Sequence, residues 1–271
     1  MKPEKLKFKS YDGYKLEGTF QPAEGSTIAA LLFVHGITSN RDELGFHSDM
    51  AIFLAAKGVA SLRFDYRYHG VFETSLENLT LSGIVNDIDA GYNALKDKVQ
   101  NTTTNFFIVG TSFGGGLVAY WVDTFEKREL KKIIFNAPVF DYEDDVLRRN
   151  DLLQDGELVE KAVKQLNSKG YIKSSGIHFG RGLINELKLI NGIHAIKKLG
   201  SRAWIFHGKD DEDVPLSSSE KFKSPETGLT IIPDVGHGFG IDIDEDLDHP
   251  ETKAIHQKIY GDVFTLIQKE I

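Results

Sequence analysis

The sequence predicts an α/β protein in which helices flank a mostly parallel central sheet and a small cap is inserted. Continuous apolar runs, which are typical of strands buried on both faces, alternate with helical periodicity along the 271 residues. One long stretch between two core strands breaks this alternation. The length suits one large domain that carries an insertion. We therefore expect a core made of residues 1–139 and 201–271, with residues 140–200 as an inserted cap.

The first half of the chain opens with a predicted hairpin over residues 5–20. Leu6 and Phe8 alternate with lysines, and Asp12-Gly13 supplies a tight turn. Strands and helices are then predicted in alternation, with strands at residues 28–36, 59–65 and 106–110 and helices at residues 48–57 and 82–97. Such alternation favours parallel strands, because each helix returns the chain to the same end of the sheet.

The second half continues this pattern around the insertion. A helix after Ser112 carries apolar residues at helical spacing, namely Leu117, Val118, Trp121, Val122 and Phe125. Further strands are predicted at residues 131–139, 202–208 and 229–235, followed by a closing helix at residues 251–269. Within the insertion, residues 141–166 are charged and predicted to be helical, and residues 170–180 are predicted to form a hairpin that turns at Ser174, Ser175 and Gly176. The alternative to a functional cap is a surface excursion with no role at a site.

Composition argues against several classes of function. The formal net charge of -8 is unsuited to nucleic acid, which draws its affinity from clustered Lys and Arg. The absence of cysteine excludes disulfides and thiolate metal sites, and the histidines show no paired metal-ligand spacing, so we expect no metal. The opening MKPEKLKFKS lacks an apolar segment before a cleavage site, and no run approaches membrane-spanning length. We therefore expect a cytoplasmic protein without a membrane partner.

The segment GTSFG at residues 110–114 fits the pattern G-x-S-x-G between a predicted strand and a predicted helix. A serine at such a sharp turn lies in strained backbone, and flanking glycines are needed because a Cβ would strike neighbouring elements. Each glycine at 114–116 costs a helix about 0.8–1 kcal/mol relative to alanine, which indicates a close backbone approach to substrate or to an adjoining strand. We expect Ser112 to be a nucleophile; the alternative is a helix N-cap serine.

A serine hydroxyl needs a positioned base, usually a histidine that a carboxylate orients. The segment RAWIFHGKDDEDVP ends one predicted strand with an acidic loop, and IIPDVGHGFG ends the next with His237. Open α/β sheets build their sites at the carboxyl ends of parallel strands. We therefore expect His237 to be the base for Ser112, with an acid from the first loop. The alternative for His237 is a loop histidine with a structural hydrogen bond.

The pattern HG-x-x-D-x-x-V-P at residues 207–215 resembles the α/β-hydrolase superfamily, in particular bacterial and archaeal carboxylesterases and feruloyl or cinnamoyl esterases. The chain is also similar to monoacylglycerol-lipase-like and serine-aminopeptidase-like hydrolases. The resemblance covers nearly the whole chain. It implies an α/β-hydrolase fold, with Asp211 as the acid of a catalytic triad and His237 as its histidine. The neighbouring Asp210, Glu212 and Asp213 stay open as alternatives for the acid, or as a solvated loop.

A tetrahedral intermediate needs two hydrogen-bond donors aimed at its oxyanion. The amide of Phe113, directly after the nucleophile, is one candidate. The resemblance implies that the second is the amide of Ile37, in the loop that follows His35-Gly36; the alternative is that His35-Gly36 merely ends a strand. The chain also departs from the family's usual residues, with Tyr68 in place of a glycine in the loop at residues 63–75.

Together these residues predict two-step acyl transfer on a small-molecule ester, with no cofactor. The cap aromatics Tyr142, Tyr171 and Phe179 are candidates for lining an acyl or aryl pocket, and the alternative is that they pack the cap on the core. A peptidase or amidase would use the same triad, and a non-catalytic binding protein would share the scaffold. The oligomeric state stays open, a homodimer included.

Overall fold

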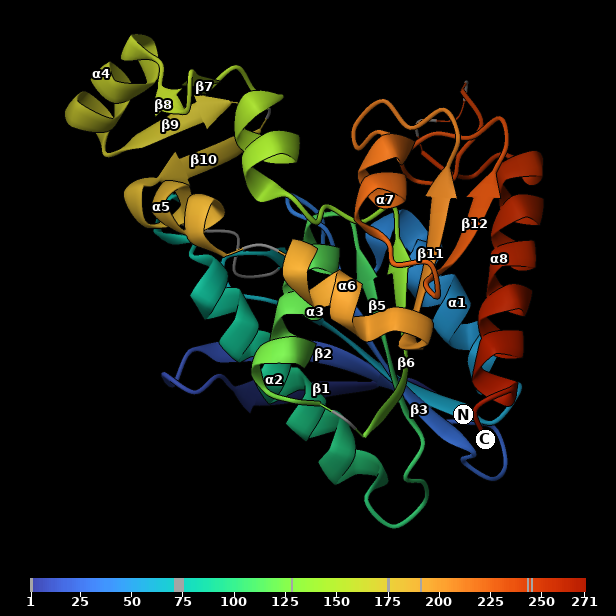
Figure 1. The fold of residues 1–271 in the computed structure, drawn as a ribbon. Helices are drawn as coiled ribbons and strands as arrows, with labels where there is room; N and C mark the ends of the chain where they lie inside the picture. The colour runs from blue at the N-terminus through green and yellow to red at the C-terminus, as the bar shows by residue number, and fades with distance from the viewer. Residues whose placement is uncertain are drawn as a thin grey trace.

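The structure is a computed structural model that describes residues 2–70, 76–127, 129–174, 176–190, 192–242, 244 and 246–271. In these ranges the centre of the protein is an eight-stranded sheet with the strand order β1-β2-β4-β3-β5-β6-β11-β12. Its strands are β1 (Glu4–Lys9), β2 (Lys15–Gln21), β3 (Ala29–Val34), β4 (Val59–Asp65), β5 (Phe106–Thr111), β6 (Leu130–Asn136), β11 (Ala203–Gly208) and β12 (Gly228–Ile232). Figure 1 shows helices on both sides of this sheet, which confirms the predicted α/β architecture.

The sheet begins antiparallel and continues parallel. Strands β1 and β2 form the predicted hairpin, in which Leu6 pairs with Gly18 and Phe8 with Leu16. Gly13 turns the chain between them at a φ of 85°, a conformation that glycine adopts without steric cost. β2 lies antiparallel to β4, and from β4 to β12 the described pairs are parallel. The carboxyl ends of the parallel strands therefore meet at one edge of the sheet.

Two helical layers bury the faces of the sheet. Helices α1 (Phe46–Ala55) and α8 (Pro250–Gln268) cover one face, and helices α2 (Leu81–Val99), α3 (Phe113–Thr124) and α6 (Ile193–Leu199) cover the other (Figure 1). Along β3, Leu32 and Val34 belong to the cluster with α2 and α3, whereas Leu31 and Phe33 belong to the cluster with α1 and α8. Successive side chains of a strand point to opposite faces, so a strand covered on both sides needs a continuous apolar run.

The last helix of the predicted insertion at residues 140–200, α6, lies on the sheet, and the small elements before it extend to the upper left in Figure 1. They are the π-helical turn η4 (Glu143–Arg148), the two-residue strands β7 (Leu153–Gln154) and β8 (Glu157–Leu158), helix α4 (Glu160–Lys169), the strands β9 (Tyr171–Ser174) and β10 (Ile177–Gly180), and helix α5 (Arg181–Leu189). The predicted hairpin at residues 170–180 is confirmed by the antiparallel pairing of β9 with β10. Ser175, predicted in its turn, lies outside the described residues.

The prediction that residues 141–166 are helical is wrong in the middle of that segment. Asp155 and Gly156 have φ angles of 52° and 83°, and they turn the chain back between β7 and β8. Helical backbone survives only at the two ends of the segment, as η4 and the first part of α4, among the residues described there. The charge of this segment is compatible with any exposed structure, so it did not distinguish a helix from a hairpin.

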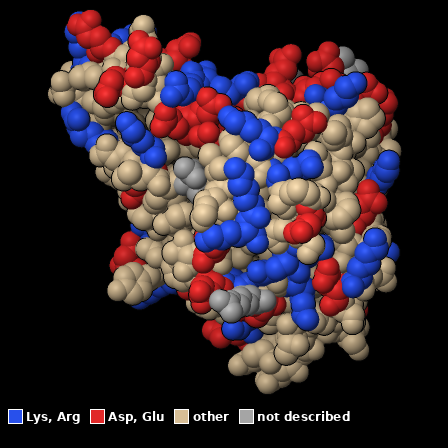
Figure 2. Space-filling view, viewed as in Figure 1, with Lys and Arg blue, Asp and Glu red and all other residues tan. Residues whose placement is uncertain are grey.

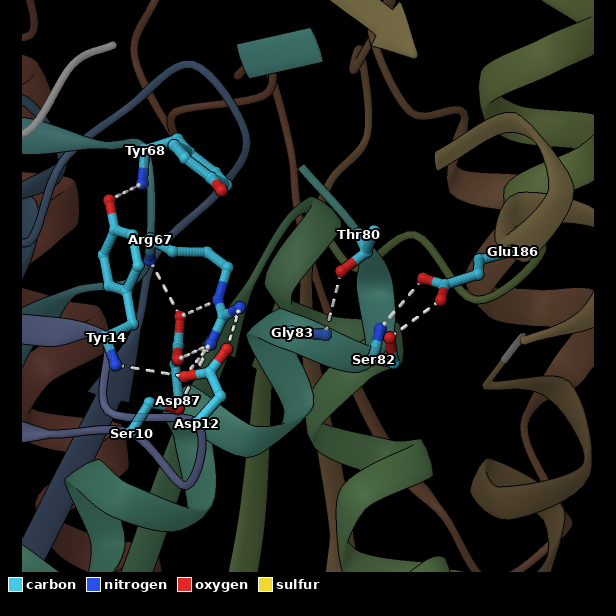
Figure 3. Close-up of polar contacts among 10 residues, drawn as sticks. All are labelled: Ser10, Asp12, Tyr14, Arg67, Tyr68, Thr80, Ser82, Gly83, Asp87 and Glu186. Atoms are coloured by element: carbon cyan, nitrogen blue, oxygen red, sulfur yellow. Dashed lines mark hydrogen bonds and ion pairs between the residues drawn. The ribbon is translucent and has the colours of Figure 1, made fainter. Parts of the chain in front are cut away.

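A buried arginine connects the chain after β4 to two other elements (Figure 3). The guanidinium of Arg67 donates to both carboxylate oxygens of Asp87 in α2, at 2.8 and 2.9 Å, and to Asp12 in the hairpin turn at 2.9 Å. The next residue, Tyr68, has a φ of 63°, in the left-handed region that glycine adopts most readily. Residues 71–75, the end of the loop predicted to resemble the family, lie outside the described residues.

Among the described residues, none of the helices combines the length and the apolar character that crossing a bilayer would require.

Candidate active site

Ser112 occupies a sharp turn between the end of β5 and the start of α3. Its φ of 51° and ψ of -123° are costly for a residue with a side chain, and such strain is concentrated at functional sites. The glycines around it permit close packing: a Cβ on Gly110 would lie 2.9 Å from the Cα of Gly115, and one on Gly114 would strike the carbonyl oxygen of His35. The glycines at 114–116 therefore accommodate adjoining backbone. The sequence had left two explanations for these glycines, a close approach to substrate or to an adjoining strand, and the structure favours the second.

Two loops at the carboxyl edge of the sheet bring His237 and Asp211 to this serine. His237 follows β12, and its Nε2 lies 2.8 Å from Ser112 Oγ. Asp211 follows β11, and its Oδ2 lies 2.7 Å from His237 Nδ1. The three side chains thus form one hydrogen-bonded line from carboxylate to hydroxyl, although they lie far apart in the sequence.

The structure distinguishes Asp211 from the other acids in its loop. Asp211 is only 6% exposed, and its Oδ1 accepts the amides of Asp213 and Val214 at 3.0 and 2.8 Å. Asp210, Glu212 and Asp213 are exposed. Burial by itself would raise the pKa of Asp211, but hydrogen bonds with His207 and His237 outweigh it and lower the pKa to about 2. Asp211 is therefore a carboxylate at neutral pH.

The hydrogen bond between Asp211 and His237 also shifts the pKa of the histidine. Burial favours the neutral imidazole, yet the hydrogen bond to Asp211 and the charge of that carboxylate outweigh it and raise the pKa of His237 above its usual value. A carboxylate at Nδ1 holds the ring with Nε2 facing Ser112 and stabilises the imidazolium that forms when the ring takes a proton.

The loop after β3 lies directly against the serine. A Cβ on Gly36 would be 3.2 Å from the Cβ of Ser112. The carbonyl of Gly36 accepts the hydroxyl of Tyr66 at 2.9 Å, and the amide of Thr38 donates to His69 Nε2 at 3.3 Å. Between these two residues, the amide of Ile37 has no acceptor in the part of the chain that the structure describes. The predicted donors Ile37 and Phe113 thus come from the two backbone segments that flank Ser112.

A cavity of about 990 Å³ opens beside His237. Part of its wall is apolar and comprises Leu44, Phe46, Val235, Phe239, Ile241 and Leu247. Carboxylates also line it, including Glu43, Asp210, Glu212, Asp213, Asp234 and Asp242, and no Lys or Arg does so among the described residues. Figure 2 shows acidic side chains gathered at the upper right of the molecule, where Figure 1 places the loops after β11 and β12. The cavity therefore combines an apolar part of its wall with a part that is negatively charged.

The three cap aromatics do not line this cavity. Tyr142 is fully buried beneath the serine turn, and its hydroxyl donates to the carbonyl of Phe113 at 2.6 Å. Phe179 is also fully buried, whereas Tyr171 is partly exposed and stacks on His178 with ring centres 4.7 Å apart. Two of these side chains have no surface free for a ligand in this arrangement, which favours the packing alternative for them.

Glu43, which no sequence pattern singled out, lies at the start of the short helix η1 (Glu43–Gly45) and lines the cavity. Its carboxylate accepts the amide of Gly36 and, at 2.9 Å, the hydroxyl of Ser39. Burial raises the pKa of Glu43, against these two hydrogen bonds and the charge of His237. The signal in the sequence was one of two adjacent acids in the polar segment TSNRDELG, which does not differ from an ordinary exposed loop.

Comparisons with known proteins identify the family and agree with the fold. Residues 25–178 match the family described as serine aminopeptidase, S33. Among solved structures, Est1E from Butyrivibrio proteoclasticus is similar, with a TM-score of 0.71 and 19% identity over 97% of this chain and 99% of that one. A putative hydrolase from Agrobacterium vitis S4 has a TM-score of 0.70 and 17% identity over 98% of both chains.

An esterase from Pyrococcus furiosus is similar at a TM-score of 0.65, with 16% identity over 99% of this chain and 91% of that one. These identities establish likeness of fold. A comparison with curated protein sequences found no match. The family match covers more than half of the chain, and together with the parallel sheet and its helical layers it shows that this protein belongs to the serine aminopeptidase S33 family of α/β-hydrolases.

Proposed function

We propose that the protein is a serine esterase that cleaves carboxylic esters through an acyl-enzyme on Ser112. The observation that carries this proposal is the line of two short hydrogen bonds, 2.7 Å from Asp211 to His237 and 2.8 Å from His237 to Ser112. A serine paired with a histidine that a buried carboxylate orients is suited to nucleophilic acyl transfer. No residue beyond these three is needed to move the proton.

In the first step, Ser112 Oγ attacks the ester carbonyl while His237 Nε2 takes the hydroxyl proton. Asp211 remains ionised and stabilises the imidazolium, in accord with its lowered pKa. The amides of Phe113 and Ile37 donate to the oxyanion of the tetrahedral intermediate. His237 then protonates the leaving alcohol. In the second step it activates water, which releases the acid and restores Ser112.

The choice of an ester rests on the neighbours' printed descriptions together with the cavity. Est1E is described with ferulic acid bound, and the Pyrococcus furiosus protein is described as an esterase. The cavity reaches His237 and Thr111, the residue before Ser112, and its apolar wall, formed by residues such as Leu44 and Phe239, would accommodate an acyl or aryl group near the nucleophile. The substrate would be a small molecule, since about 990 Å³ is the size of a ligand pocket.

A second candidate is cleavage of an amide that carries a free amino group. The family's description as serine aminopeptidase favours it, and so do the carboxylates around the cavity, since a protonated amine would be attracted to them. The triad would serve both reactions. The two candidates therefore differ in the leaving group that His237 must protonate.

The test compares initial rates on p-nitrophenyl esters from acetate to octanoate, on methyl ferulate and on aminoacyl anilides, for the wild type and Ser112→Ala. We expect ester turnover that falls by a factor of order 10³ or more in the variant. Turnover of anilides without esters would replace the esterase proposal by the peptidase. Equal rates in both proteins, with no labelling of Ser112 by a fluorophosphonate, would indicate a non-catalytic binding protein.

A further inference from the structure

The carboxylate of Glu43 holds both ends of the loop at residues 36–39. One oxygen accepts the amide of Gly36, and the other accepts the hydroxyl of Ser39 at 2.9 Å. The two anchored residues enclose Ile37, whose amide is the proposed second oxyanion donor. A single side chain therefore restrains the segment on either side of that amide.

This loop needs restraint because its backbone is not in a relaxed conformation. Thr38 has a φ of 61°, in the left-handed region that β-branched residues avoid. The opposite side of the loop is held by the Tyr66 hydroxyl on the Gly36 carbonyl and by His69 on the Thr38 amide. Glu43 supplies the remaining anchors, on the Gly36 amide and on Ser39.

Glu43 also reaches this position through strained backbone. Glu43 and Leu44 have φ angles of 46° and 49°, and Gly45 follows at 94°. Two consecutive left-handed residues with side chains persist only where surrounding contacts compensate for them. The hydrogen bonds of the Glu43 carboxylate are such contacts. A Cβ added to Gly36 would lie 3.3 Å from a carboxylate oxygen of Glu43 and 3.2 Å from the Cβ of Ser112. Gly36 is thus enclosed between Glu43 and the nucleophile.

We propose that Glu43 is a positioning residue, whose carboxyl group clamps the loop at residues 36–39 so that the Ile37 amide meets the oxyanion formed at Ser112. The proposal rests on the proposed acyl transfer. Glu43 touches no reacting atom in it. Its contribution would be confined to the step in which negative charge develops on the substrate, because an oxyanion donor acts mainly in the transition state.

The chain offers a matched control at a distance from the site. Glu186 in α5 makes the same pair of bonds, accepting the Ser82 amide at 3.0 Å and the Ser82 hydroxyl at 2.7 Å (Figure 3). Glu186→Ala removes the same number and kinds of hydrogen bond as Glu43→Ala. It leaves the loop beside Ser112 untouched. The comparison therefore separates the general effect of losing two such hydrogen bonds from the specific effect of losing those that hold the loop at residues 36–39.

The experiment measures kcat and KM on the best p-nitrophenyl ester, together with the rate of fluorophosphonate labelling, for Glu43→Ala, Glu43→Gln and Glu186→Ala. Removal of one oxyanion donor costs roughly 10²–10³ in kcat. Loosening one should cost less, and we expect a loss of roughly 10- to 100-fold in kcat for Glu43→Ala, with little change in KM and a parallel loss in labelling rate. Glu186→Ala should match the wild type.

Glu43→Gln should recover most of the activity. The glutamine oxygen accepts the Gly36 amide, and its nitrogen donates to the hydroxyl oxygen of Ser39, so both anchors survive without the charge. A Glu43→Gln variant as slow as Glu43→Ala would overturn the clamp, since the charge would then matter. A change in KM alone, or wild-type rates in Glu43→Ala, would overturn it too.

Two further variants make the result decisive. If Glu43→Ala does not fold, Ser39→Ala removes one of the two anchors, and it should lower kcat several-fold; unchanged kcat in that variant overturns the proposal. Ser112→Ala separates the two levels of inference. Full activity in Ser112→Ala refutes the acyl transfer itself, whereas an inactive Ser112→Ala beside a fully active Glu43→Ala refutes the clamp alone.

Discussion

Asp211 Oδ2 lies 2.7 Å from His237 Nδ1, and the backbone amides of Asp213 and Val214 hold the other oxygen of the same carboxylate. Hydrogen bonds within its own loop thus fix one oxygen of the aspartate, and the other oxygen contacts the histidine. This arrangement orients the ring towards Ser112 and raises the pKa of His237, and the first two predictions follow from it.

Asp211→Asn should lower kcat by a factor of order 10³–10⁴, because an amide at this position favours the wrong tautomer of His237 and no longer stabilises the imidazolium. Ester hydrolysis at neutral pH measures the effect. Glu220→Gln, an exposed change on helix α7 (Leu216–Phe222), is the control and should keep the wild-type rate. A loss of less than about 10-fold in Asp211→Asn would assign the acid to another residue.

The pH profile should reflect the raised pKa of His237. The base works only when neutral, so kcat/KM rises as pH passes upward through this pKa, and half-maximal kcat/KM should lie above pH 6.5, the usual value for histidine. Asp211, with a pKa of about 2, stays ionised throughout this range. In Asp211→Asn the cause of the raised pKa is gone while burial remains, so the midpoint of the residual activity should move to lower pH. A wild-type midpoint below 6.5 would contradict the assignment.

The charge around the cavity should produce a preference among esters of equal size. Carboxylates such as Asp210 and Asp234 line it without a Lys or Arg among the described residues, and a cavity of one sign concentrates ligands of the opposite sign. We expect kcat/KM to be roughly 10-fold higher for an ester with an ammonium group than for its carboxylate analogue. Raising the ionic strength should reduce the ratio towards one, because salt screens exposed charges. A ratio unaffected by salt would mean that shape, not charge, decides.

The Arg67 cluster predicts unequal effects on stability from two similar changes. Asp87 is fully buried, so Asp87→Asn leaves the Arg67 guanidinium poorly compensated and should lower the free energy of unfolding by about 3–5 kcal/mol. The side chain of Asp12 is 47% exposed, and Asp12→Asn should cost at most about 1 kcal/mol. Urea unfolding followed by circular dichroism measures both. Equal losses in the two variants would show that burial does not govern this pair.

Much of the fold was predictable because its signals are local. The continuous apolar runs of β3 and β5 reflect strands that are buried on both faces. The spacing of apolar residues within α3 reflects a helix that is buried on one face. Burial of either kind leaves a recognisable pattern in the sequence. The insertion was harder. Residues 141–166 carry charge, which any exposed structure tolerates, and the turn at Asp155-Gly156 decided against a continuous helix.

By itself, the sequence determined the strand-to-helix turn at Ser112 and a histidine after a later strand, since both are short patterns tied to the ends of strands. Only the tertiary structure decided which of four neighbouring acids meets His237, and it brought Glu43 to the loop beside Ser112. The physical reason is the direction of side chains in loops. Hydrogen bonds with the backbone set that direction for Asp211, and contacts between distant segments set it for Glu43. Neither leaves a periodic trace in the sequence.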